Sequence, residues 1–246
     1  MYIKRHAEDA VSKLSKMFGA VLVTGPRQVG KTTMLKKVAE HAAYVTLDDR
    51  LLLATAVEQS GTFFKDNPPP VFIDEVQYAP NLFLQIKIII DRDKKKGQFF
   101  MSGSQQFHMM KNVSESLAGR LGLLTLLGLS IREKQSVDFS DPFLPTDDYF
   151  TARRQNIKDL SYDDVWYNIH RGGMPELYVN KDFDWQMFYG AYVKTYIERD
   201  VRELTQVGDE VKFLRFMTVA ASHIGQLLNL ASLARDVGIS QPTAER

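Results

Sequence analysis

Gly25-Pro26-Arg27-Gln28-Val29-Gly30-Lys31-Thr32 is the stretch that decides the fold, because it fits the pattern G-x-x-x-x-G-K-[ST]. Gly25 and Gly30 let the backbone curl so that successive N–H groups point at phosphate oxygens. A helix that starts near Lys31 would add its positive dipole end. Lys31 is expected to bind the β- and γ-phosphates, and the Thr32 hydroxyl is expected to coordinate Mg²⁺. The stretch therefore predicts a P-loop that binds ATP, or another purine nucleoside triphosphate, with Mg²⁺.

The surroundings of this loop fit the same prediction. An apolar run, Ala20–Val23, precedes it as a strand would, and a helical pattern, Lys31–His41, follows it. A glycine turn that matched the pattern by chance would need neither the strand before it nor the helix after it. The residues expected to contact the nucleotide here are Gly25, Pro26, Arg27, Gln28, Val29, Gly30, Lys31, Thr32 and Thr33.

A P-loop also needs an acid that organises the metal at the end of another strand, and Val71-Phe72-Ile73-Asp74-Glu75 supplies one. Asp74 would hold Mg²⁺ through water, and Glu75 would act as the general base that polarises the attacking water. P-loop kinases usually lack an acid directly after the metal-binding Asp. The pair therefore favours hydrolysis over phosphoryl transfer to a second substrate.

A further apolar run ends in Met101-Ser102-Gly103-Ser104-Gln105. A polar side chain here could lie between the P-loop strand and the acid strand and sense the γ-phosphate. The competing explanation is that these small polar residues only form the turn that follows the strand. The sequence does not choose between Ser102 and Ser104.

Short apolar runs alternate with helix-length segments through the first half of the chain. The runs are Ala20–Val23, Ala43–Leu47, Val71–Ile73, Gln98–Met101 and Leu123–Leu127, and the segments are Lys31–His41, Leu51–Phe64, Asn81–Lys94 and Glu115–Arg120. Repeated strand-helix units predict an α/β fold with a parallel sheet and right-handed crossovers.

The pattern changes after about residue 135, where only helices are predicted. Ser161 and Asp164 form a capping box that opens a helix, and Gly172-Gly173 ends it. Helices are also predicted over Trp185–Leu204 and Glu210–Ser222. Asn229–Thr243 reads as helix, glycine turn and helix, which is a helix-turn-helix.

The composition excludes several classes of protein. The chain has 246 residues, of which 44% are apolar and 25% charged, with a net charge of +1 and no cysteine. Disulfides, thiolate nucleophiles and thiolate zinc sites are therefore excluded, and no overall field attracts nucleic acid or membrane. The longest uncharged run, Leu121–Ile131, is well short of the roughly 20 residues of a membrane-spanning helix. With charged residues from Lys4 on and no signal peptide, a cytoplasmic protein without membrane contact is expected.

The motifs together resemble those of uncharacterised prokaryotic AAA-type ATPases that carry a C-terminal domain of unknown function. The resemblance covers nearly the whole chain. Beyond the P-loop it runs through Leu47-Asp48-Asp49, Ile73-Asp74-Glu75-Val76-Gln77, Ser102-Gly103-Ser104, Leu117-Ala118-Gly119-Arg120, Gly172-Gly173-Met174-Pro175-Glu176 and Tyr196-Ile197-Glu198-Arg199-Asp200-Val201. It implies the additional-strand core, in which the strand ending at Ser102 lies between the P-loop strand and the acid strand.

The resemblance also implies a domain plan. An ATPase core is expected over residues 1–135, a loop and lid-like helices over 136–205, and the start of a winged-helix-like domain over 206–246. In the family this last part continues past the position of Arg246, so the chain is expected to be incomplete.

Two more site residues follow from the family pattern. Arg120 could sense the γ-phosphate or act as an arginine finger, in cis or from a neighbouring subunit of a homo-oligomer; it could equally be a charged residue beside a strand. Gly173-Met174-Pro175 resembles a turn that related ATPases place against adenine, so Pro175 would contact the base; a helix cap followed by a helix breaker is the alternative.

The sequence therefore predicts Mg²⁺-dependent ATP binding and hydrolysis coupled to a conformational change. The alternative is a slowly hydrolysing nucleotide switch that regulates DNA or protein binding, and a small-molecule or protein kinase is a third, less favoured reading. Gln241, Thr243 and Arg246 of the helix-turn-helix could contact DNA, although many such motifs serve only for packing.

Overall fold

The computed structural model describes residues 2–103, 117–138, 141–156, 158–196 and 210–245. The chain divides into two compact units, residues 1–182 and 183–246, and each is described by itself. Among the described residues, no helix combines the length and the apolar character that crossing a bilayer requires.

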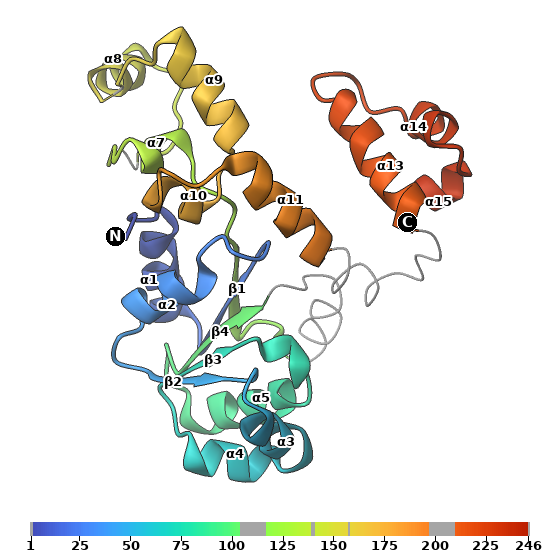
Figure 1. Ribbon diagram of the computed structural model, residues 1–246. Coiled ribbons are helices and arrows are strands. Elements are labelled where there is room, and N and C mark those ends of the chain that lie inside the picture. The colour runs from blue at the N-terminus through green and yellow to red at the C-terminus, as the bar shows by residue number, and fades with distance from the viewer. Residues whose placement is uncertain (1, 104–116, 139–140, 157, 197–209, 246) are drawn as a thin grey trace. The chain divides into compact units, whose positions relative to one another are not determined.

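The first unit is built on a parallel sheet of five strands in the order β2-β3-β4-β1-β5 (Figure 1). The strands are β1 Ala20–Thr24, β2 Ala43–Thr46, β3 Val71–Asp74, β4 Phe99–Gly103 and β5 Leu121–Thr125. β4 lies between β1, which leads into the P-loop, and β3, which ends at Asp74. The predicted parallel α/β fold and the additional-strand order are confirmed.

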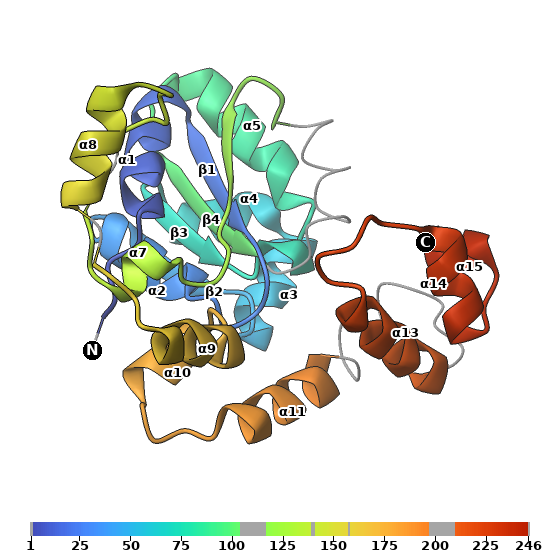
Figure 2. The same ribbon diagram turned by 90° about the horizontal axis from the view of Figure 1, so that it is seen from above.

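Helices cover both faces of this sheet, as Figure 2 shows from above. One face packs on α1 and α2 through Val21, Val23, Phe72 and Phe100. The other packs on α3, α4 and α5 through Leu22, Ile73, Phe99 and Met101. The helices of this core are α1 Ala7–Met17, α2 Lys31–Val38, α3 Arg50–Glu58, α4 Ser60–Asp66, the 3₁₀ helix η1 Val76–Tyr78 and α5 Leu82–Asp93. Strands buried on both faces explain the continuous apolar runs.

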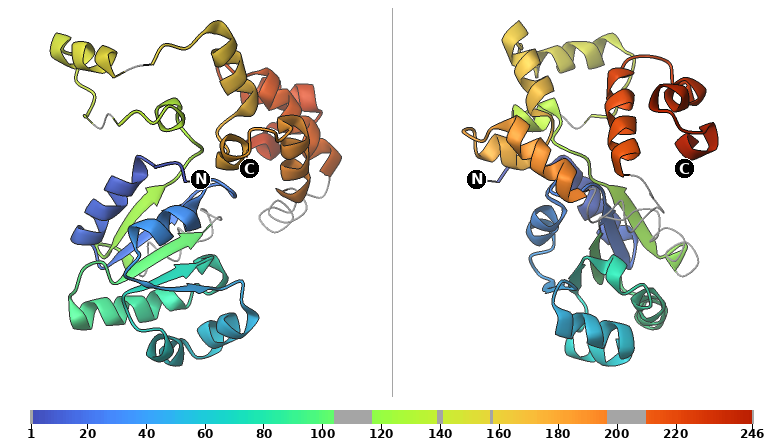
Figure 3. Two further views of the ribbon diagram at one scale, coloured as in Figure 1. Left: turned by 60° about the vertical axis from the view of Figure 1, so that its left-hand side comes forward. Right: turned by 45° about the vertical axis from the view of Figure 1, so that its right-hand side comes forward.

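The rest of the first unit is helical and lies beyond the helix-sheet-helix layers (Figure 3). Its helices are α7 Ile131–Lys134, α8 Asp147–Gln155, α9 Tyr162–Arg171 and α10 Pro175–Val179. The predicted capping box of Ser161 and Asp164 opens α9, and Gly172 ends it. The backbone N–H of Leu129 donates to the Gly173 carbonyl at 2.6 Å, which ties the helices after residue 135 to the core.

The second unit contains α11 Trp185–Tyr196, α13 Glu210–Ser222, α14 Leu230–Val237 and α15 Gln241–Glu245. Asn229 caps α14 by accepting a hydrogen bond from the Ser232 N–H at 3.0 Å. Gly238 ends this helix with a left-handed φ of 81°, and Ser240 accepts from the Thr243 N–H at the start of α15. The predicted order of helix, glycine turn and helix is present.

Several boundaries differ from the expectations. The helix expected over Leu51–Phe64 is two helices, α3 and α4, which meet at Gln59. β5 begins at Leu121 rather than Leu123 because Leu121 pairs with Ala20. α1 was not among the predicted elements. The expected domain borders after residues 135 and 205 stay predictions.

Candidate nucleotide-binding site

The loop Gly25–Gly30 connects β1 to α2 at the carboxyl ends of the strands. Gly25 has φ 139°, and a Cβ there would lie 2.1 Å from the Leu126 carbonyl oxygen, so only glycine fits. Gly30 has φ 90° and precedes the first residue of α2. The two glycines therefore sit where the backbone needs them, and the first turn of α2 presents its N–H groups at the loop.

Lys31 is the first residue of α2 and is 8% exposed. Its Nζ donates to the Gly25 carbonyl at 3.0 Å and to the Pro26 carbonyl at 2.7 Å. Carbonyls of the loop thus hold the ammonium inside the curl of the backbone. A polyphosphate entering this loop would meet that charge directly.

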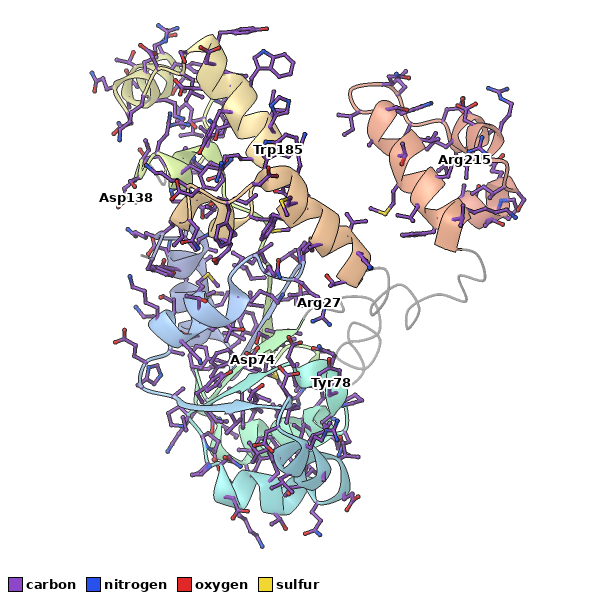
Figure 4. The ribbon with its side chains drawn as sticks, viewed as in Figure 1. Arg27, Asp74, Tyr78, Asp138, Trp185 and Arg215 are labelled. Atoms are coloured by element: carbon purple, nitrogen blue, oxygen red, sulfur yellow. The ribbon has the colours of Figure 1, made fainter. Side chains whose placement is uncertain are left out.

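Asp74, at the end of β3, is 6% exposed and lies beside the P-loop helix. Its Oδ2 accepts from the Thr32 hydroxyl at 2.8 Å. Its Oδ1 accepts from the Ser102 hydroxyl and, at 3.2 Å, from the Glu75 N–H. Side chains from the first turn of α2 and from the end of β4 therefore meet at the carboxylate that ends β3. Figure 4 marks Asp74 in this position and Arg27 in the loop.

Glu75 follows Asp74 with a left-handed backbone, φ 55° and ψ 43°, which is uncommon for a residue other than glycine. The chain turns here from β3 into η1. The side-chain amide of Gln77 donates to Glu75 Oε2. The base candidate is thus the immediate neighbour of the metal-binding candidate, and its carboxylate is engaged by an amide.

The side-chain oxygens of Thr32 and Asp74 are suitable ligands for Mg²⁺. This cation commonly uses one or two carboxylates and completes its shell with waters and substrate phosphates. The Thr32 hydroxyl and the Asp74 carboxylate are 2.8 Å apart and supply such a partial set. Within the described part of the chain, no group of three His, Cys, Asp or Glu residues could hold a metal on its own.

Ser102 is fully buried, and its hydrogen bond to Asp74 brings it into the site, whereas Ser104 lies outside the described residues. Pro175 begins α10. A Cβ on Gly30 would be 3.9 Å from Pro175 Cγ, so the Gly173–Pro175 turn reaches the P-loop.

Arg120 is not brought to this site. It directly precedes β5, and its carbonyl accepts from the Ala20 N–H at the start of β1, so it lies at the end of the sheet opposite the P-loop. Its guanidinium forms an ion pair with Asp91 of α5, with Nε 2.5 Å from Oδ1. The expectation that Arg120 senses the γ-phosphate in cis does not fit this placement, because the length of a strand separates it from Thr24.

Other residues that support the site were not predicted from the sequence. Tyr44 donates to Asp74 Oδ2 at 3.2 Å. Arg5, only 4% exposed, donates to the P-loop carbonyl of Val29 at 2.7 Å and forms an ion pair with Glu133 at 3.1 Å. Neither belongs to a motif with a fixed spacing from the P-loop. Gln77 had a weak signal, since it lies two residues after Glu75 in the acid motif.

Comparisons with known proteins agree with this geometry. Residues 18–135 match a family model described as an AAA domain, and residues 162–246 match a domain of unknown function, DUF8612. Two uncharacterised proteins, Rv2008c of Mycobacterium tuberculosis and Mb2031c of Mycobacterium bovis, are each 30% identical over 251 residues. These matches cover 100% of this chain and 51% of each relative, so the chain spans about half the length of the curated relatives it matches.

The fold is also similar to a solved structure, the Walker-type ATPase PABY2304 of Pyrococcus abyssi. The TM-score is 0.53 at 14% identity, over 96% of this chain and 89% of the other. At this identity the similarity concerns the fold alone. The two family matches confirm the predicted resemblance: the chain is similar to AAA-type proteins over residues 18–135 and to DUF8612 domains over residues 162–246.

Proposed function

We propose that the protein binds ATP with Mg²⁺ and hydrolyses it. The observation that carries this proposal is the convergence of Thr32 and Ser102 on the Asp74 carboxylate, next to a loop that holds Lys31 in its curl. AAA domains are nucleotide-binding P-loop domains, and the family match supports the same reading.

In this proposal the loop amides and Lys31 bind the β- and γ-phosphates and leave the γ-phosphorus facing Glu75. The Glu75 carboxylate accepts a proton from water as the water oxygen bonds to the γ-phosphorus. The bond from that phosphorus to the bridging oxygen breaks, and ADP leaves. Mg²⁺, held through Thr32 and Asp74, would neutralise charge on the phosphate oxygens. Pro175 would contact the adenine from its position beside Gly30.

Phosphate release by the wild type and by the Glu75→Gln variant tests this proposal. The amide cannot accept the proton, so hydrolysis should slow by about 10²–10⁴-fold. ATP binding, measured by calorimetry, should be preserved because Glu75 does not contact the phosphates. Equal turnover in both proteins would remove Glu75 from the mechanism.

A slowly hydrolysing nucleotide switch is the second candidate, and one contact favours it. The Gln77 amide engages the carboxylate that would have to receive the proton. A switch should cleave ATP faster than it releases ADP, so single-turnover hydrolysis would exceed steady-state turnover. Affinity for DNA that depended on ATP and fell steeply with salt would identify the partner of the helix-turn-helix, α14 and α15.

Arg120 keeps only a role in trans in this proposal. Its side chain is 32% exposed and forms an ion pair with Asp91. In a homo-oligomer it could therefore extend into the nucleotide site of a neighbouring subunit. Mixing a Lys31→Ala variant with an Arg120→Ala variant tests this role. Activity restored in the mixture would support a shared site, and no restoration would reject it.

A further inference from the structure

We propose that Tyr44 is a positioning residue for Asp74, whose hydroxyl keeps the carboxylate in the orientation that organises Mg²⁺ beside Thr32. The inference rests on the proposed function of the site, and it adds a residue from the edge strand β2. The Tyr44 hydroxyl donates to Asp74 Oδ2 at 3.2 Å, the same oxygen that accepts from Thr32.

The sheet register brings Tyr44 and Asp74 onto one face. β2 and β3 pair in parallel with Tyr44 beside Phe72 and Thr46 beside Asp74. Laterally paired residues share a face of the sheet, as do residues two apart along a strand. The Tyr44 side chain therefore reaches diagonally across the neighbouring strand to the carboxylate. Only a long side chain with a terminal donor can span that diagonal.

Two neighbours hold the Tyr44 ring in place. The Phe72 ring lies at a centroid distance of 5.3 Å with an interplanar angle of 56°. Lys36 Nζ lies 3.6 Å from the centroid of the Tyr44 ring, in a cation–π contact. Lys36 belongs to α2, the helix that carries Lys31 and Thr32. The ring thus bridges the P-loop helix and the edge strand while its hydroxyl faces the carboxylate.

The two oxygens of Asp74 have different hydrogen-bond partners. Asp74 Oδ1 is already occupied by Ser102 and the Glu75 N–H, so Tyr44 and Thr32 orient the other oxygen.

A purely structural role for Tyr44 predicts a different outcome from a positioning role. If only the ring matters, phenylalanine replaces tyrosine fully, because the contacts with Phe72 and Lys36 survive. If the hydroxyl orients Asp74, phenylalanine weakens the contribution of the metal to nucleotide binding. That contribution is the ratio of the nucleotide Kd in EDTA to the Kd in Mg²⁺, and it needs no turnover.

The experiment is calorimetric titration of the β,γ-imido analogue of ATP into the wild type and the Tyr44→Phe variant, with Mg²⁺ and with EDTA. Loss of a typical intramolecular hydrogen bond should change the ratio about 3–10-fold. We expect the ratio to fall by that factor in Tyr44→Phe, with little change of the Kd in EDTA. In an Asp74→Ala background the same substitution should have no further effect.

The chain offers a matched control in Tyr2. Its hydroxyl donates to Glu8 Oε1 at 2.7 Å, and Lys37 Nζ lies 4.2 Å from the centroid of its ring. Tyr2 therefore makes the same two kinds of contact as Tyr44, but with a carboxylate other than Asp74. Tyr2→Phe should leave the ratio unchanged. A Tyr44→Phe ratio within twofold of the wild type, or an equal fall of the ratio in Tyr2→Phe, would overturn the role of Tyr44 and leave the proposed function of the site intact. Absence of analogue binding by the wild type would overturn the proposed function, and the inference with it.

Discussion

Asp74 illustrates how single side chains build this site. It is nearly buried, and its oxygens accept hydrogen bonds from Ser102, Thr32, Tyr44 and the Glu75 N–H. These donors fix the orientation of the carboxylate. Each donor therefore contributes both to the fold and to the proposed metal site.

Replacing Ser102 with Ala should destabilise the protein by about 1–3 kcal/mol, because a buried hydrogen-bond donor to a charged group is lost. Urea unfolding measures the change in the free energy of unfolding. Ser15→Ala is the control, since that hydroxyl only donates to the Ser12 carbonyl within α1. A Ser102→Ala variant as stable as Ser15→Ala would contradict this role.

Glu133 predicts a pH dependence of stability. Burial alone would raise its pKa, but the backbone N–H groups of Ser130 and His6, with Arg5, outweigh burial and lower the pKa below the ordinary value of 4.5. A carboxyl whose pKa is lowered by folding stabilises the protein above its unfolded pKa, and this contribution is lost as the pH falls through the folded pKa.

The stability advantage of the wild type over Glu133→Gln should therefore be full at pH 7 and should shrink below about pH 4.5. Urea unfolding of both proteins at a series of pH values measures it. A difference in stability that stayed constant on acidification would show that the Glu133 charge is not coupled to folding.

Sequence motifs could predict the residues of the site whose spacing is fixed by local backbone geometry. Lys31 and Thr32 follow the glycine turn directly, and Asp74 ends a recognisable strand. Tyr44 and Arg5 could not be predicted, because their contacts with Asp74 and Val29 arise from strand register and chain packing. Arg120 was associated with the site by family pattern, but the direction of β5 carries it to the opposite end of the sheet.

At the scale of elements, the turn from β1 into α2 is the feature that places the phosphate site. Gly25→Ala should distort this turn, because φ 139° is strained for alanine and the new Cβ would lie 2.1 Å from the Leu126 carbonyl oxygen. We expect nucleotide binding to be lost and the melting temperature to fall.

Gly61→Ala is the control for this substitution. Gly61 lies in α4 with nothing within 4 Å of an added Cβ, and a helical Gly-to-Ala change should be neutral or stabilising by up to about 1 kcal/mol. Calorimetry and thermal unfolding of both variants compare the two sites. Normal nucleotide affinity in Gly25→Ala would mean that the turn tolerates a different backbone.

The elements themselves were predictable where one physical signal dominated. β1, β3 and β4 are buried on both faces and read as apolar runs. The break between α3 and α4 was missed although the polar stretch Glu58–Thr62 interrupts the apolar residues there, and the chain bends at Gln59. α1 was missed because charged residues are frequent in it and Val11 is its one buried residue.

At the scale of the whole molecule, every residue placed at the site belongs to the first unit, residues 1–182. This unit has its own core around the sheet. A fragment of residues 1–182 should therefore fold and bind the ATP analogue with a Kd within about threefold of the full chain, because this unit contains every described residue of the site.

Circular dichroism checks that the fragment is folded, and calorimetry measures its affinity. Cooperative unfolding with no analogue binding would contradict the expectation that residues 1–182 are sufficient for binding.

The most direct test of the P-loop is calorimetric titration of ATP with Mg²⁺ into the wild type and into Lys31→Ala. The account predicts a saturable heat with a stoichiometry near one for the wild type, and its loss in a Lys31→Ala variant that still unfolds cooperatively. Equal binding by both proteins, or no heat from the folded wild type, would contradict the claim that the loop from Gly25 to Thr32 holds a polyphosphate.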